Sequence, residues 1–149
     1  MKIEIEFDLD NLVNECIHQS LLDTQLFQSK EGVPMTDAVA LSSSNNDVVL
    51  TELGSQLAQL YTAFADKVEY SYTDELFITI DCHERTISNS FRETIASHLK
   101  DYLKYGILAW WNEARNKELH FQYKMKQEDV RSFITNIVFP KIRRTYNYY

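Results

Sequence analysis

The sequence predicts a mostly α-helical fold of about four helices with two short β-strands. Three observations support this prediction. Long segments repeat apolar residues at helical spacing, two short segments alternate like strands, and the 149 residues include only three Gly and two Pro. The length fits a single domain, which we place at residues 1–140, followed by a C-terminal tail at 141–149.

The first part of the chain predicts one strand followed by one helix. Ile3, Ile5 and Phe7 alternate with charged residues, the two-residue period of a half-buried strand. An aspartate at position 8 or 10 can then cap a helix that ends near residue 27. Its apolar face consists of Leu12, Val13, Cys16, Ile17 and Leu21.

Residues 28–46 show no sustained periodicity and include Gly32, Pro34 and a Ser/Asn run at 42–46. Structureless connections of this length are uncommon in compact domains unless they are functional or disordered. The segment is therefore either a surface loop or an arm that orders against a neighbouring subunit. The sequence leaves both interpretations open.

The middle of the chain predicts a second helix and a second strand. From Asp47 onward, apolar residues recur in steps of three and four over about six turns. They are Val49, Leu53, Leu57, Leu60, Tyr61, Phe64 and Val68. Residues 76–82 then read as a strand, which we expect to pair with the first strand or with a neighbouring subunit.

A third helix is predicted to begin at a capping box formed by Ser90 and Glu93 and to end near Arg115. Its segment 102–111 is apolar nearly all round. Such a helix either lies at the centre of the core or has a second face covered by a partner. In the second case, the interface includes Tyr105, Leu108 and Trp111.

Residues 117–139 predict the last helix. Their start alternates like a strand, but the apolar residues from Val130 to Val138 follow helical spacing, and the helix should end before Pro140. The tail beyond it mixes cations with tyrosines. It can dock in a protein groove, contact nucleic acid, or remain a frayed terminus. The side chains proposed to make such contacts are Arg143, Arg144, Tyr146, Tyr148 and Tyr149.

Charge and composition narrow the class of protein. The formal net charge of −7 argues against wholesale nucleic-acid binding. Residues 1–96 contain 5 Lys/Arg and 17 Asp/Glu, whereas residues 97–149 contain 10 Lys/Arg and 5 Asp/Glu. This asymmetry either favours head-to-tail contact between identical subunits or reflects two charged surfaces that only contact solvent. The start resembles no secretory signal and no segment is apolar enough to span a membrane, so we expect an intracellular protein without membrane contact.

No residue pattern indicates catalysis, a cofactor or a metal. Cys16 and Cys82 match no redox or metal spacing and are expected to be buried thiols. The four histidines form no metal-binding motif, and the polar run at 81–84 is expected to be a strand end leading into a loop. A phosphate-binding loop is improbable with three glycines. We therefore expect a protein that is not an enzyme.

Four segments, 1–5, 76–80, 99–111 and 141–144, supply an acidic first strand, a second strand, a long helix with aromatic residues at its end, and a basic tail. In this order of elements the chain resembles small virion proteins of tailed bacteriophages.

This resemblance implies a head-to-tail connector, or a ring or adaptor protein of the phage neck, that forms a homo-oligomeric ring and contacts other virion proteins such as portal or tail components. It implies a location in the virion, and in the host cytoplasm during assembly, with only incidental proximity to DNA. No catalytic residues come with it. The alternative function is a small cytoplasmic protein-binding or regulatory module.

Overall fold

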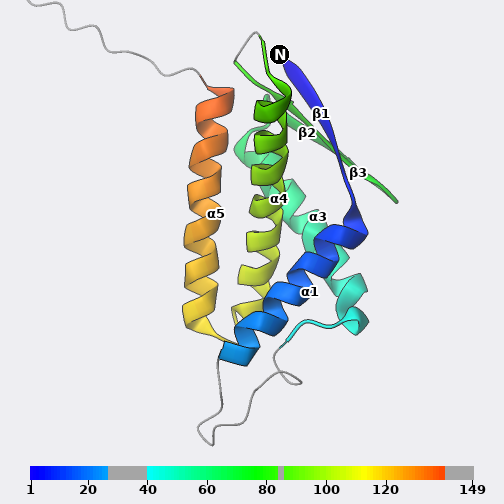
Figure 1. Cartoon of the computed structure of the whole chain (residues 1–149), viewed down its shortest axis with the longest axis vertical. Coiled ribbons are helices and arrows are strands. Elements are labelled where there is room, and N and C mark those ends of the chain that lie inside the picture. The colour runs from blue at the N-terminus through cyan, green and yellow to red at the C-terminus, as the bar shows by residue number, and fades with distance from the viewer. Residues whose placement is uncertain (27–39, 84–85, 140–149) are drawn as a thin grey trace, which may run out of the picture.

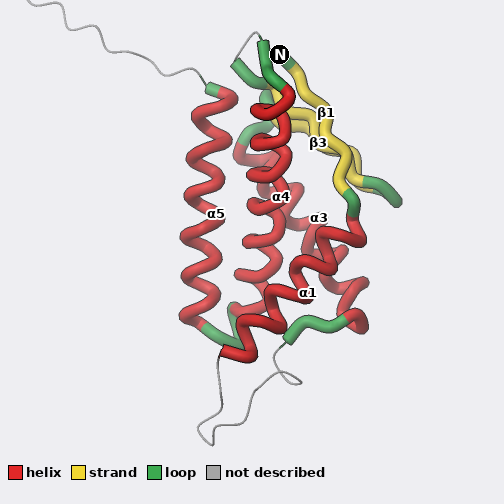
Figure 2. Tube along the Cα trace, in the orientation of Figure 1, coloured by secondary structure: helices red, strands yellow, loops and turns green. Residues whose placement is uncertain are grey.

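The computed structural model describes residues 1–26, 40–83 and 86–139 of the chain. Four long helices and a small sheet make up this part (Figures 1 and 2), which confirms the mostly helical fold class. In chain order the elements are β1 (Lys2–Phe7), α1 (Leu9–Leu26), the short 3₁₀ turn η1 (Ser43–Asn45), α3 (Asn46–Ala63), β2 (Val68–Tyr72), β3 (Leu76–Asp81), α4 (Asn89–Asn112) and α5 (Lys117–Val138).

Helix α4 occupies the centre of the molecule. It packs along α5 and also contacts α3, α1 and β1. Figure 1 shows α5 on one side of α4, while α1 crosses on the other side. Because α5 packs chiefly along α4, its opposite side is directed away from the rest of the described structure.

The sheet is antiparallel, with β3 between β1 and β2. Ile3 of β1 lies opposite Ile80 of β3, and Ile5 lies opposite Ile78, so their side chains cover one another on the buried face. The charged residues between them point to the other face, as period-two alternation requires. The two predicted strands thus pair with each other, one of the two alternatives left open.

Strand β2 was not predicted, and the helix expected to continue to Val68 ends at Ala63. The chain turns at once, since the amide nitrogens of Lys67 and Val68 both donate to the carbonyl oxygen of Phe64. Val68 then lies opposite Ile80. Its side chain is buried, as predicted, but it belongs to a strand and not to a helix. The described sheet therefore has three strands, whereas two were predicted.

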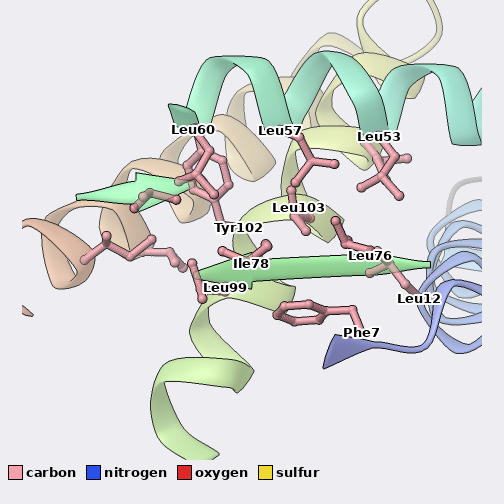
Figure 3. Close-up of a cluster of buried hydrophobic side chains, with 14 of the residues drawn as sticks. Phe7, Leu12, Leu53, Leu57, Leu60, Leu76, Ile78, Leu99, Tyr102 and Leu103 are labelled. Atoms are coloured by element: carbon pink, nitrogen blue, oxygen red, sulfur yellow. The ribbon is translucent and has the colours of Figure 1, made fainter. Parts of the chain in front are cut away.

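One hydrophobic core joins the sheet to the helices. Figure 3 shows leucines of α3 above β3, with side chains of α4 between them. Leu57, Ile78 and Leu103 come from three different elements and are fully buried. The described helices and strands therefore share one core.

A line of side-chain amides crosses this core where three helices meet. Gln127 of α5 donates from Nε2 to Oε1 of Gln56 in α3, at 2.9 Å, and to the backbone carbonyl oxygen of Tyr102 in α4, at 3.1 Å. Gln56 donates in turn to Glu52. These amides lie directly against Gly106, whose missing side chain leaves the space that they fill.

The N-cap of α4 lies two residues before the predicted one. Ser88 is the N-cap, and its hydroxyl oxygen accepts from the amide nitrogen of Phe91 at 3.2 Å. Ser90 lies inside the first turn, so the predicted pair of Ser90 and Glu93 is not the cap. The pattern had the right spacing, but the preceding Ser88 has the extended backbone that an N-cap needs.

We expect Ser88→Ala to lower the free energy of unfolding by about 1 kcal/mol, because it removes an acceptor for an otherwise unpaired helix amide. The matched variant Ser90→Ala should change it by less than about 0.5 kcal/mol, as exposed substitutions away from caps usually do. Chemical denaturation of both variants makes the comparison. Equal losses would show that the hydroxyl of Ser88 is not the stabilising group.

Part of the predicted loop at 28–46 lies within the described structure. Leu41 is buried, and its amide nitrogen donates to the hydroxyl of Ser20 at 2.8 Å. The Ser/Asn run forms η1 and leads directly into α3. Residues 27–39 and the predicted tail at 141–149 lie outside the described residues.

Candidate protein interface

Among the described residues, helix α5 packs against the rest of the subunit along one face. Asn116 caps its start by accepting from the amide nitrogen of Leu119 at 3.2 Å. The inward face then repeats at steps of three and four residues. Its buried residues are Leu119, Tyr123, Gln127, Val130, Ile134, Ile137 and Val138.

The outward face of α5 has two large apolar side chains in its N-terminal half. Phe121 is 63% exposed and Met125 is 71% exposed, the highest values among the large apolar side chains of the described residues. At 3.6 residues per turn, four residues separate two side chains by roughly 40°, so the pair forms one patch. Single exposed apolar residues are ordinary on protein surfaces. Two neighbouring ones, on a helix whose other face already packs in the core, are typical of a contact surface.

The α4 residues predicted to form an interface lie mainly inside the subunit. Leu108 is fully buried, Trp111 is 7% exposed and Tyr105 is half-buried. Packing of α1, α3 and α5 around α4 therefore accounts for the all-round apolar character of this helix. A role of these three residues in contacts between subunits remains a prediction.

Two of these aromatic side chains have cations on their rings. The guanidinium carbon of Arg115 lies 3.6 Å from the ring centroid of Trp111, and the ammonium groups of Lys104 and Lys126 lie within 6 Å of that of Tyr105. Such contacts cover the outer faces of rings with charged groups. The remaining predicted interface residues, Arg143, Arg144, Tyr146, Tyr148 and Tyr149, lie outside the described residues.

A buried carboxylate fastens the end of α1 to α5. The hydroxyl of Tyr123 donates to Asp23, and Gln19 donates to the same carboxylate at 3.0 Å. Asp23 is 7% exposed. Burial raises the pKa of the Tyr123 hydroxyl, and its hydrogen bond to Asp23 and the charge of that group raise the pKa further. The arrangement keeps the tyrosine neutral and in place, which suits a structural role.

Other side chains that could take part in chemistry also make packing or hydrogen-bond contacts within the fold. Burial raises the pKa of the Cys16 thiol to about 12, so this side chain is a poor nucleophile at neutral pH. The ring of His98 stacks on Phe133, with centroids 3.7 Å apart, and His120 bonds the carbonyl oxygen of Ala109. Within residues 1–26, 40–83 and 86–139, no cluster of His, Cys, Asp and Glu is placed to hold a metal ion.

The acidic N-terminal part surrounds a hollow of about 660 Å³ where β1 meets α1 and the β2–β3 turn. Five carboxylate side chains line it, together with apolar and amide groups. The acidic residues are Glu6, Asp8, Asp10, Asp74 and Glu75. Five of the acidic residues of the first part of the chain therefore lie close together at one end of the sheet.

Sequence reasoning missed the patch on α5. Phe121 and Met125 were counted as part of a strand-like alternation with Leu119 and Tyr123. On a helical wheel the two pairs fall on opposite sides, and this is the signal that could have identified the exposed pair.

Comparisons with protein families, curated proteins and solved structures found no match to this chain. In the part of the chain that the structure describes, no helix is both long and apolar enough to cross a membrane. The class of the protein must therefore be argued from its surface.

Proposed function

We propose that this chain is a structural virion protein of a tailed phage, a head-to-tail connector or neck ring or adaptor subunit that acts through protein–protein contacts and not through catalysis. The observation that carries the proposal is the exposed pair Phe121 and Met125 on α5. An assembly subunit needs apolar surface that its own core does not cover.

The engagement of potentially reactive groups in packing supports the same function. Tyr123 and Asp23 join two helices, and Cys16 lies in the core. The partners proposed here are other copies of the chain, in a ring, and portal or tail components of the virion. The alternative, a small cytoplasmic regulatory module, also uses an exposed apolar patch but requires no particle.

Deleting the gene from the genome that encodes it should give DNA-filled heads without attached tails, while mass spectrometry should detect the chain in the undeleted particles. The reason is that a missing neck subunit removes the surface on which the tail assembles. Electron microscopy of purified particles provides the measurement. Normal tailed particles without this chain would contradict the proposal and favour the regulatory alternative.

Complementation with variants tests the surface itself. We expect Phe121→Ala/Met125→Ala to restore tailed particles poorly, because truncating central interface side chains costs most of their binding energy. Val48→Ala/Tyr61→Ala is the matched control, since those apolar side chains are about half exposed and lie on α3. Equal complementation by the two double variants would show that α5 does not form the proposed contact.

A further inference from the structure

We infer that the outward face of α5 binds the same face of a second copy of this chain, with the two helices side by side and parallel. The inference rests on the proposed function, because it names the partner of the surface proposed there. Its support is the spacing and the charge of the exposed residues of α5.

The exposed centre of α5 follows a heptad spacing. Steps of four and three residues alternate along it, the pattern by which two helices pack along a common seam. Its positions are Phe121, Met125, Glu128, Ser132, Thr135 and Phe139, all of them exposed. Apolar groups stand at both ends, short side chains lie between, and Glu128 is paired with Arg131 at 3.6 Å, which offsets its charge.

The two flanks of this seam differ in charge. One flank repeats a cation every seven residues, at Lys117, Lys124 and Arg131, and all three are exposed. The other flank repeats at the same interval a carboxylate or a side-chain amide. Its residues are Gln122, Asp129 and Asn136. No cation stands on the second flank and no carboxylate on the first.

This difference selects the direction of the second helix. In a parallel pair each flank faces the opposite flank of the other copy, so Lys124 faces Asp129 of the second copy five residues further on. In an antiparallel pair the cationic flank faces itself, and like charges repel. Charge complementarity therefore favours a second copy of this chain in the parallel orientation.

The first experiment measures self-association of the full chain by sedimentation equilibrium over a concentration series. We expect Phe121→Ala/Met125→Ala to raise the dissociation constant at least about tenfold, because these two side chains are the most exposed large apolar groups of the seam. Val48→Ala/Tyr61→Ala should leave it within about twofold, as changes outside a contact do. A wild-type chain that stays monomeric, or equal effects of both variants, overturns the inference.

Charge reversal tests the orientation. Lys124→Glu should raise the dissociation constant about threefold or more, and Lys124→Glu/Asp129→Lys should return it close to the wild-type value, because the pair is restored with its sign exchanged. Tighter association of Lys124→Glu alone would overturn the parallel arrangement, because it would mean that cations face each other in the wild type.

A cross-link supplies an independent readout. Parallel, in-register helices place Thr135 opposite Thr135 of the second copy, so Thr135→Cys should form a disulfide dimer under mild oxidation, whereas Ser55→Cys on α3 should not. Cys16 and Cys82 are buried and should add little background. Absence of a Thr135→Cys dimer above the control level overturns the register. A chain that is present in virions but monomeric and insensitive to these changes would refute only the pairing, not the proposed function.

Discussion

Gly106→Ala is expected to lower the free energy of unfolding by about 2–4 kcal/mol, through overpacking and the loss of buried hydrogen bonds. A Cβ atom at this position would lie 2.1 Å from Oε1 of Gln56 and 2.5 Å from Nε2 of Gln127. Both amides must then move. Because the two glutamines are buried, moving them breaks bonds that water cannot replace.

Gly54 offers a matched control in the same protein. Its nearest neighbour for an added Cβ is Cε1 of Tyr72 at 3.6 Å, an ordinary contact. Gly54→Ala should therefore stabilise the protein by about 0.5–1 kcal/mol, the usual gain for a helix interior. Urea denaturation of the two variants should show a lower free energy of unfolding for Gly106→Ala and a higher one for Gly54→Ala. A stabilised Gly106→Ala variant would show that the amide line is not packed as described.

Tyr123→Phe is expected to lower the free energy of unfolding at pH 7 by about 1.5–3 kcal/mol, the range for hydrogen bonds to charged groups. The variant keeps the ring and its stacking on Tyr105 but leaves the buried carboxylate of Asp23 with one donor fewer. Tyr105→Phe is the matched control, since that side chain is only half-buried and should cost less.

The stability of Tyr123→Phe should also depend on pH differently from that of the wild type at alkaline pH. The pKa of Tyr123 is raised in the folded protein above its ordinary value of 10.0. A neutral tyrosine therefore stabilises the fold fully below about pH 10, and this contribution declines as the pH rises above that value. Tyr123→Phe should lose stability less steeply than wild type between pH 10 and 11. An identical slope would mean that Tyr123 is not protected from ionisation.

Local patterns of the chain predicted most elements, but they misplaced the end of α3 and the start of α4. Alternation at Ile3 and Ile5 identified β1, and apolar spacing identified α1, α3, α4 and α5, because burial of one face repeats at the period of the element itself. The N-cap lies at Ser88 and not at Ser90, although only Ser90 is followed by a glutamate three residues later. Only the backbone conformation distinguishes them.

Strand β2 could not be predicted from the local sequence pattern. Glu69, Tyr70 and Ser71 are exposed, so they carry no apolar alternation. The strand exists because its backbone pairs with β3 and Val68 packs opposite Ile80. This pairing depends on a partner strand that follows later in the chain, and tertiary contact can override helical spacing.

The sequence by itself determined the helical class, the positions of two strands and the acidic character of the first part of the chain, since these follow from composition and period. Only the tertiary structure decided that Leu108 and Trp111, on the all-round apolar helix, are buried within the subunit. The same holds for the amides of Gln56 and Gln127, which meet over Gly106 although 71 residues separate them. Which side of a helix is covered depends on the helices packed around it, and that arrangement is not encoded in any single segment.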